Sequence, residues 1–274
     1  MCGIAGIFLT DQNLSSSLGN LLTKMLGPLG DRGPDSAGVA IYKEADENTT
    51  KITVQSENPV HDFLKLSENI KIQTGRNVII EPIDSHAIIK LDELDVSTVF
   101  DYLKNDTNVR IMSVGAKVEI YKEIGSPDQV LERFNVSAMG GTHAIGHTRM
   151  ATESRVTTLG AHPFSTGTDQ CLVHNGSLSN HNNLRRNIEQ SGFNFETEND
   201  SEVAAAYLTE KMNMGHNLKA ALEMSLNDLD GFFTFVVGTK NGFGVLRDKI
   251  ACKPAVMAQT DRYVAFGSEF RALA

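Results

Sequence analysis

Four short apolar segments in the last third of the chain constrain its fold more than any other feature of the sequence. Each is rich in aromatic and β-branched residues and is separated from the next by turn-forming residues, which is typical of strands. Helical patterns at 201–213 and 217–228 come just before them. Runs of strands beside helices predict an α+β fold with mostly antiparallel hairpins. The four segments are FFTFVVGT (232–239), GFGVLRD (242–248), AVMAQ (255–259) and YVAFGS (263–268).

The N-terminal part of the chain contains similar elements. GIAGIF (3–8) and GVAIYK (38–43) have the composition of strands. Between them, leucine and methionine recur at helical spacing over 14–29, which predicts an amphipathic helix. Asp11 or Asn13 is available as the N-cap of that helix.

Residues 51–140 differ from the rest of the chain. A strand-like run (HAIIKL) leads to a helix-like run (DVSTVFDYLKN), and a second strand-like stretch (NVRIMSVGAKVEIYKE) leads to a second helix-like run (SPDQVLERF). This compact βαβα pattern contains no cluster of polar residues suited to catalysis. We therefore expect an inserted βαβα-type subdomain at 51–140, within one domain that spans 1–274.

The composition excludes several classes of protein. The 274 residues carry a formal net charge of −9, whereas a nucleic-acid-binding protein usually shows a basic patch, so no nucleic-acid partner is expected. No apolar run is long enough to span a bilayer and the N-terminus lacks the basic residues of a signal peptide, so no membrane partner is expected. Three cysteines at distant positions imply no disulfide framework, which fits a cytoplasmic protein.

The chain begins MCGI, with a cysteine directly after the initiator methionine. Cys2 could be a small apolar residue at the start of a buried strand, because free cysteine packs like a small hydrophobic group. Alternatively, removal of Met1 makes Cys2 the N-terminal residue, which then carries both a thiol and a free α-amine. An α-amine has an ordinary pKa of about 8, so part of it is unprotonated at neutral pH and can take the proton of the thiol. Position alone leaves both interpretations open.

Four further stretches carry polar residues suited to chemistry: RGPDSAG (32–38), GHTRMAT (146–152), HNGSLSN (174–180) and ENDSEV (198–203). In this order after MCGI, they resemble the motifs of the class II glutamine amidotransferases, N-terminal-nucleophile hydrolases that release ammonia from glutamine. The resemblance runs from residue 2 to about 270 and is interrupted by the insertion. It implies a four-layer αββα sandwich and L-glutamine as the substrate. No cofactor is expected.

The resemblance also implies the catalytic residues. Cys2 is the expected nucleophile, and glycine at position 3 would let the backbone pass close to the substrate. The Asn175 side chain and the Gly176 backbone N–H are expected to bind the oxyanion that forms when the thiol attacks the carboxamide. Asn-Gly is also a strong signal for a hairpin turn, and a turn that exposes these donors is compatible with the same role.

Arg149, Thr152 and Asp200 are the expected contacts for the charged end of glutamine. The guanidinium of Arg149 would pair with the α-carboxylate, and Thr152 could hydrogen-bond the same group. Asp200 would bind the α-ammonium. Apart from the resemblance, Arg149 could be a strand-edge residue in a surface ion pair. Asp200 could be part of a helix cap, because Asn199 and Glu202 have the spacing of a capping box.

The loop at 32–38 is expected to lie near the nucleophile. Arg32 and Asp35 are expected to brace the loop. The resemblance also implies that Arg32 binds substrate, and a plain turn without a direct substrate role is an equal alternative. Met150 and Glu153 depart from the family pattern, which often has tryptophan and histidine at these positions. These departures concern the lining of the glutamine pocket rather than the chemistry.

No metal site is expected, although several histidines stand near the motifs. His143 and His147 would share one face of a strand, but residues four apart on a strand are about 13 Å apart, too far to bind one metal. Cys171 and Cys252 are expected to be core residues. The histidines considered are His143, His147, His162 and His174.

No sequence pattern of a second active site accompanies these motifs. The ammonia acceptor is therefore expected on another polypeptide or in a longer form of this chain. RGPDSAG with an insertion before GHTR most resembles the stand-alone amidotransferase subunit of multi-subunit glutamate synthases and the related N-methylglutamate synthases, which predicts a synthase subunit as partner. A non-catalytic glutamine sensor or structural subunit is the alternative. A self-processing amidase of the same class would need a propeptide and would leave Arg149 and Asp200 without a reason to be paired.

Overall fold

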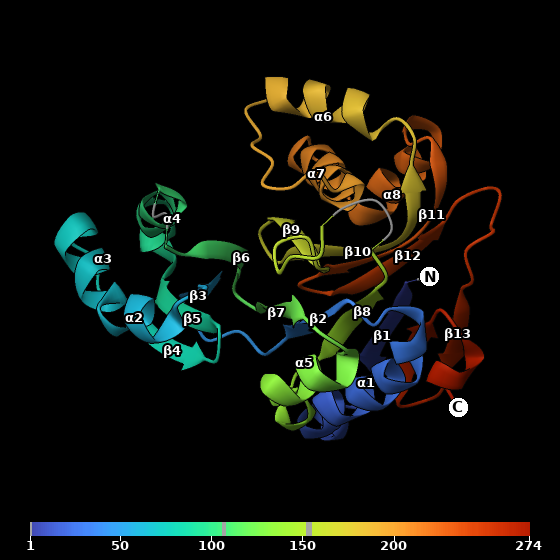
Figure 1. Cartoon of the computed structure of the whole chain (residues 1–274), viewed down its shortest axis with the longest axis horizontal. Coiled ribbons are helices and arrows are strands. Elements are labelled where there is room, and N and C mark those ends of the chain that lie inside the picture. Colours follow the sequence, from blue (N-terminus) through green and yellow to red (C-terminus); the bar gives the residue numbers. More distant parts are fainter. Residues whose placement is uncertain (1, 106–107, 152–154) are drawn as a thin grey trace.

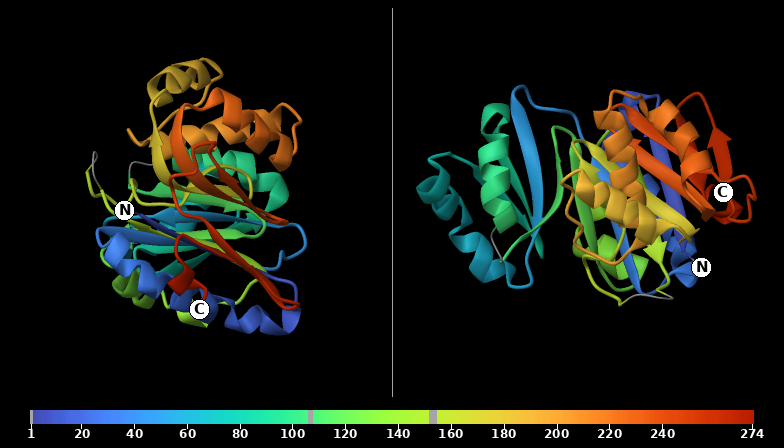
Figure 2. Two further views of the ribbon diagram at one scale, coloured as in Figure 1. Left: turned by 90° about the vertical axis from the view of Figure 1, so that its right-hand side faces the viewer. Right: turned by 90° about the horizontal axis from the view of Figure 1, so that it is seen from above.

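The computed structural model describes residues 2–105, 108–151 and 155–274. Two antiparallel sheets lie face to face, and helices cover the outer face of each (Figure 1). The view from the side in Figure 2 shows these layers stacked in the order helix, sheet, sheet, helix. The αββα sandwich expected from the sequence is therefore confirmed.

The first sheet has six strands in the order β13-β14-β1-β8-β2-β7. Successive side chains of a strand point to opposite faces, so Ile4 packs between the two sheets, whereas Ala5 and Ile7 pack toward helix α1 (Leu18–Leu26). Strand β1 pairs with β14, which brings the two ends of the chain side by side. The strands are β1 Gly3–Leu9, β2 Ser36–Tyr42, β7 Val118–Ile124, β8 His143–Arg149, β13 Val256–Gln259 and β14 Tyr263–Gly267.

The second sheet has four strands in the order β12-β11-β10-β9. Helices α7 (Asp200–Asn213) and α8 (Leu218–Asp228) cover its outer face, and α6 (His181–Gln190) packs beside α7. Three consecutive alanines of α7, at 204–206, are buried in the core that this helix shares with the sheet, where small side chains allow a close approach. The strands are β9 Phe164–Gly167, β10 Gln170–Leu178, β11 Gly231–Thr239 and β12 Gly242–Arg247.

The helix expected at 14–29 is shorter in the structure. Only Leu18–Leu26 is α-helical, and a 3-10 helix lies on each side of it. Pro28, two residues after the end of α1, lacks the backbone N–H that would continue the helix. The Asp11 carboxylate accepts a hydrogen bond from the backbone N–H two residues on, so Asp11 caps the first 3-10 helix. The 3-10 helices are Gln12–Ser17 and Gly27–Arg32.

A third sheet forms a separate subdomain beside the sandwich, at the left of Figure 1. Its four antiparallel strands have the order β4-β5-β3-β6, and helices α2, α3 and α4 enclose an apolar core of its own. The elements are β3 Thr49–Gln55, α2 Pro59–Leu64, α3 Leu66–Thr74, β4 Ile79–Ile83, β5 His86–Asp92, α4 Val96–Asn105 and β6 Arg110–Gly115.

This subdomain differs from the insertion expected at 51–140. Elements β3, α2, α3 and β4 add to the βαβα pattern, and the stretch expected as one strand forms two, β6 in the third sheet and β7 in the first. The Asp169 carboxylate accepts hydrogen bonds from the backbone N–H groups of 116–118, which fixes the turn between them. Helix α5 (Pro127–Arg133) packs on β2 of the sandwich. We therefore propose that the insertion spans Thr49–Gly115.

The strands and helices predicted in the last third of the chain are confirmed as β11–β14, α7 and α8. Of the two cysteines expected in the core, Cys171 is buried, but Cys252 is exposed, so that prediction is wrong for Cys252. Cys252 lies in the segment between β12 and β13, outside both sheets. In the part of the chain that the structure describes, no helix has the length and apolar character needed to cross a membrane.

Candidate active site

Cys2 lies directly before β1, in the middle of the first sheet. Gly3 pairs with Thr148 of the antiparallel strand β8, so the next residue of β8, Arg149, lies beside Cys2. On the other side of β8, Arg149 pairs with Ser36 at the start of β2. The register of three neighbouring strands therefore brings the motifs MCGI, GHTR and RGPDSAG together at the same end of these strands.

The sequence predicts that glycine at position 3 lets the backbone pass close to the substrate, but the structure shows a different reason for this glycine. A Cβ atom at this position would lie 2.7 Å from the Thr148 hydroxyl oxygen and 2.8 Å from Cβ of Leu29. The space beside Gly3 is therefore filled by the protein itself. The glycine allows close packing behind the nucleophile rather than a close approach of the substrate.

Two side chains hold the backbone of Cys2. Its carbonyl oxygen accepts hydrogen bonds from Arg32 Nε at 3.0 Å and from Asn175 Nδ2 at 3.1 Å. The residue is half-buried, and its thiol sulfur lies 3.8 Å from the carbonyl oxygen of Met150. The contacts fix the position of Cys2 while leaving its thiol partly accessible.

Arg32 also forms an ion pair with Glu269, just beyond β14. The hydrogen bond from Arg32, together with Arg271, holds the pKa of Glu269 below its ordinary value despite an opposing effect of desolvation. Glu269 stands in none of the motifs, and only the pairing of β14 with β1 brings it near Cys2. The contacts of Arg32 with the Cys2 carbonyl and with Glu269 favour a positioning role over the expected contact with substrate.

Asn175 and Gly176 lie inside strand β10, opposite Thr234 and Phe233 of β11, so they do not form the hairpin turn that Asn-Gly often forms. Gly176 has a φ angle of +153°, and a Cβ atom there would lie 2.0 Å from the carbonyl oxygen of Phe232. Only glycine therefore fits at this position. Since Asn175 reaches Cys2 from the second sheet, the site lies where the two sheets face each other.

Arg149 is buried at the end of β8 and is only 5% exposed. Its Nη1 atom donates a hydrogen bond to the carbonyl oxygen of Arg155 at 3.4 Å. Burial lowers the pKa of Arg149, while the thiol of Cys2 and the carboxylates of Asp35 and Asp200 oppose that effect. A buried guanidinium among these groups is suited to bind a carboxylate. The alternative of a surface ion pair is excluded by its burial.

Asp35 braces the segment that follows β8. Its backbone N–H donates to the carbonyl oxygen of Arg149 at 3.1 Å, and its carboxylate accepts a hydrogen bond from the backbone N–H of Ala151 at 2.8 Å. Asp35 therefore joins the loop at 32–38 to the segment after β8, and its bracing of the loop itself stays a prediction. Thr152 and Glu153 lie outside the described residues.

Asp200 is the first residue of α7, but it is not the cap of that helix. The N-cap is Asn199, whose side chain accepts a hydrogen bond from the backbone N–H of Ser201. The carboxylate of Asp200 instead accepts a hydrogen bond from the backbone N–H of Leu178 at 2.9 Å, at the end of β10. Glu202 does not complete a capping box, because its carboxylate binds the backbone N–H groups of residues 196 and 197.

The ionised form of the Asp200 carboxyl group is strongly favoured over the neutral form. Burial raises the pKa of its carboxyl group, but His174, the Leu178 N–H and His181 outweigh it and lower the pKa to about 2. Asp200 is therefore ionised at neutral pH. A fixed negative charge near Arg149 is suited to bind the α-ammonium of an amino acid whose carboxylate binds Arg149.

Three buried histidines lie behind this cluster. The rings of His147 and His162 stack with centroids 4.0 Å apart, and His147 Nε2 lies 2.9 Å from the carbonyl oxygen of His174. His174 Nδ1 lies 2.8 Å from the Ser201 hydroxyl. Burial lowers the pKa of His147 to about 3 and that of His162 well below its ordinary value, so both are neutral. Within residues 2–105, 108–151 and 155–274, no three His, Cys, Asp or Glu side chains are placed to hold a metal ion.

Comparisons with known proteins show the family to which this chain belongs. A family model for a glutamine amidotransferase domain matches residues 147–274. The glutamine amidotransferase-like protein GlxB of Rhizobium meliloti (strain 1021) is 60% identical over 276 residues, which cover 100% of this chain and 91% of GlxB. The glutamine–fructose-6-phosphate aminotransferase (isomerizing) of Thermococcus kodakarensis is 30% identical over 138 residues, which cover 50% of this chain and only 23% of that enzyme.

Among solved structures, glutamine phosphoribosylpyrophosphate amidotransferase from B. subtilis, complexed with ADP and GMP, aligns with a TM-score of 0.63. The alignment covers 99% of this chain and 43% of that one, at 19% identity, and it shows a common fold. The αββα sandwich is thus the fold that this chain shares with that amidotransferase. By its relatives and its family model, this chain belongs to the class II glutamine amidotransferases, the enzymes that hydrolyse glutamine and transfer its ammonia.

Proposed function

We propose that Met1 is removed and that Cys2, then the N-terminal residue, is the nucleophile of glutamine hydrolysis. The observation that carries the proposal is the convergence of three separate strands on Cys2. Arg149 of β8 lies beside Cys2 in register, and Asn175 of β10 donates a hydrogen bond to the Cys2 carbonyl oxygen at 3.1 Å. Strand β1 holds Cys2 at its N-terminal end, where the residue is only half-buried.

The reaction that this arrangement supports has two stages. The α-amine of Cys2 accepts the proton of the thiol, and the thiolate attacks the carboxamide carbon of glutamine. The second N–H of the Asn175 amide and the N–H of Gly176 then stabilise the oxyanion. The proton on the amine passes to the leaving nitrogen. Ammonia then leaves, and a γ-glutamyl thioester remains on Cys2. Water hydrolyses this thioester, which releases glutamate and restores the thiol.

Arg149 and Asp200 are proposed to bind the α-carboxylate and the α-ammonium of glutamine. Arg149 is buried, and both Asp200 and Asp35 act electrostatically on its guanidinium. A zwitterion that lies between opposite charges can bind in one orientation only, which directs its carboxamide toward Cys2. Arg32 and Asp35 are proposed to position the nucleophile and the segment after β8.

We further propose that the ammonia is passed to a separate synthase subunit of the glutamate synthase type, in the cytoplasm. This chain covers 91% of GlxB, which leaves little of that relative for an acceptor domain, whereas it covers 23% of the fructose-6-phosphate aminotransferase. The resemblance to the stand-alone subunits of glutamate and N-methylglutamate synthases supports the choice of partner. We propose that residues 1–274 form one amidotransferase domain.

The test of the nucleophile combines two measurements on one sample. Glutamine hydrolysis by the purified chain is followed by the release of ammonia and glutamate, and the intact mass shows whether Met1 is present. We expect activity, a mass without Met1, and no activity in Cys2→Ala. Active protein that retains Met1 would contradict the mechanism. Retained Met1 with glutamine binding but no hydrolysis would favour a glutamine sensor.

The partner is tested with glutamine that carries 15N in its amide group. A flavin-binding synthase subunit that co-purifies with this chain should incorporate the label into its product, and Cys2→Ala should abolish the incorporation. A synthase subunit that neither co-purifies with the chain nor receives the label would count against the glutamate synthase assignment while leaving hydrolysis untouched.

A further inference from the structure

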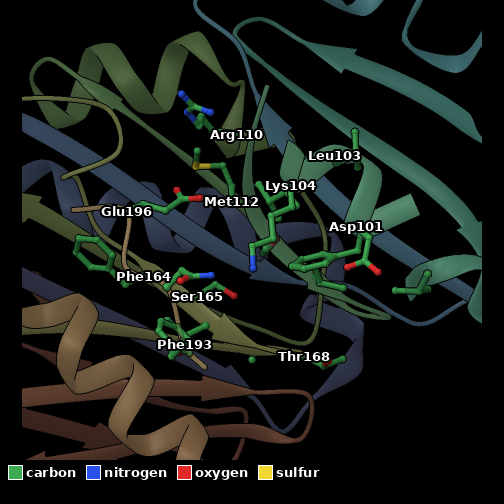
Figure 3. Close-up of a pocket in the computed structure, with 18 of the residues that line it drawn as sticks. Asp101, Leu103, Lys104, Arg110, Met112, Phe164, Ser165, Thr168, Phe193 and Glu196 are labelled. Carbon is green, nitrogen blue, oxygen red and sulfur yellow. The ribbon is translucent and has the colours of Figure 1, made fainter. Parts of the chain in front are cut away.

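A large cavity lies between the third sheet and the sandwich, away from Cys2 (Figure 3). It has a volume of about 730 Å³, within the range of about 300–1,000 Å³ that is usual for sites that bind small molecules. One wall is formed by α4 and β6 of the subdomain, and the other by β9 and the segment before α7. None of the residues assigned to glutamine chemistry lines it.

The wall on the subdomain side carries two basic side chains that form no ion pair with a described carboxylate. Lys104 of α4 and Arg110 of β6 line the cavity, and Figure 3 shows the Lys104 side chain pointing into it. Among the described residues, neither side chain has a carboxylate oxygen within 4.0 Å. Lys122 also lines the cavity, but its ammonium is already bound by the carbonyl oxygens of residues 159, 161 and 163. Lys104 and Arg110 are therefore the cations available to a ligand.

The rest of the lining combines apolar and aromatic side chains with hydroxyl groups and four carboxylates, those of Glu93, Asp101, Glu196 and Glu202. Phe100 and Met112 on one wall, and Phe164 and Phe193 on the other, offer apolar surface against which a flat group can pack. On the sandwich side, desolvation and the neighbouring Glu202 raise the pKa of Glu196, whereas Arg110, Lys122 and Lys104 lower it, so these cations act on Glu196 across the cavity. Glu196 can accept a hydrogen bond from an amine of a ligand.

We propose that this cavity is a second ligand site, which binds a small organic anion with a flat apolar body. The anionic group binds Lys104 and Arg110, the flat body packs on the aromatic side chains, and an N–H of the ligand faces Glu196. An inorganic anion would satisfy only the two cations, and a neutral aromatic molecule only the apolar surface.

The walls of the cavity are continuous with the proposed glutamine site. Lys122 holds the loop 155–163, and this loop includes the carbonyl of Arg155 that accepts the hydrogen bond from Arg149. On the other wall, residues 196 and 197 lead directly into Asp200. The side chain of Asn199 joins the two segments through a hydrogen bond to the carbonyl oxygen of Gly160 at 3.4 Å. A ligand in the cavity therefore contacts the two segments that hold Arg149 and Asp200. We expect its binding to change the affinity for glutamine, an expectation that rests on the proposed function.

The site is tested with 8-anilinonaphthalene-1-sulfonate, an aromatic sulfonate with an N–H whose fluorescence rises in apolar surroundings. The full chain should bind it saturably, and Lys104→Met with Arg110→Met should raise its Kd at least about tenfold. Lys65→Met with Lys71→Met removes the same charge from exposed positions on the same subdomain and should change Kd less than about twofold. Phe193→Ala should weaken binding several-fold. The proposal is overturned by equal effects of the two double variants, or by no saturable binding.

The coupling needs a separate measurement. Glutamine binding to the Cys2→Ala chain, which cannot turn it over, is measured with and without saturating sulfonate. Coupled sites must change each other's affinity by the same factor. An unchanged glutamine Kd would overturn the coupling and leave the second site intact. Failure of glutamine to bind at all would overturn the proposed function, while the sulfonate titration would still decide the second site.

Discussion

Replacing Asp200 by asparagine separates the charge of this side chain from its shape. Asparagine keeps one oxygen that can accept the 2.9 Å hydrogen bond from the Leu178 N–H, so the local structure is expected to persist. The loss is the charge-assisted contact with the α-ammonium of glutamine, worth about 1.5–3 kcal/mol. Since each 1.4 kcal/mol is a factor of ten, we expect kcat/KM for glutamine to fall roughly 10- to 150-fold. We expect this fall to come from a higher KM with little change in kcat, because the contact stabilises bound glutamine and the transition state equally.

The assay compares two substrates, glutamine and 4-carbamoylbutanoate, which is glutamine without its α-amino group. Asp200→Asn should lower kcat/KM for glutamine and leave the value for 4-carbamoylbutanoate within about twofold of wild type. Asp230→Asn is the control, because Asp230 is an exposed acid that accepts a hydrogen bond from the Ser179 hydroxyl, and it should affect neither substrate. Equal losses on both substrates in Asp200→Asn would refute the reasoning, since Asp200 would then act on the fold rather than on the ammonium.

Three further predictions concern the same cluster. Arg149→Lys should raise KM for glutamine about 10- to 100-fold in steady-state kinetics, because lysine cannot bind a carboxylate with two parallel hydrogen bonds; an unchanged KM would contradict the assignment. Asn175→Ala should lower kcat about 10²- to 10³-fold with a small change in KM, as expected for an oxyanion donor, and a change confined to KM would exclude that role. The pKa of Asp200 is lowered from 3.8 to about 2, so its carboxylate stabilises the fold above pH 4 and the effect is lost as the pH falls toward 2. Urea unfolding should therefore show wild type more stable than Asp200→Asn by about 2 kcal/mol at pH 7 and equally stable near pH 2; a difference independent of pH would count against this origin.

Local sequence patterns were sufficient for most elements of the sandwich. The strands of the last third and helices α7 and α8 could be predicted because aromatic and β-branched residues mark strands and apolar residues at helical spacing mark helices, which are both local patterns. The division of 108–123 into β6 and β7 could not, since the turn between them is fixed by Asp169, more than fifty residues further along the chain. Helix α1 is shorter than its leucine pattern because Pro28 follows it.

The motifs marked the residues of the site, but not how they meet. Cys2 and Arg149 become neighbours only through the register of β1 with β8. The Asn175-Gly176 pair suggests a turn when it is considered alone, yet its place in β10 is set by pairing with β11. Glu269 belongs to no motif, because its contact with Arg32 depends on β14 lying beside β1. Contacts of this kind arise from tertiary pairing, which a local pattern does not contain.

The most direct test of the account is to find the atom that attacks glutamine. A diazoketone analogue of glutamine, in which the carboxamide is replaced by a reactive carbon, should form a thioether with the nucleophile and lose nitrogen gas. After digestion and mass spectrometry, we predict a single adduct, on the thiol of a peptide that begins at Cys2. Excess glutamine should prevent the labelling. An adduct on Cys171 or Cys252, or an adduct on a peptide that still begins with Met1, would contradict the central claim that Cys2 acts as the N-terminal nucleophile.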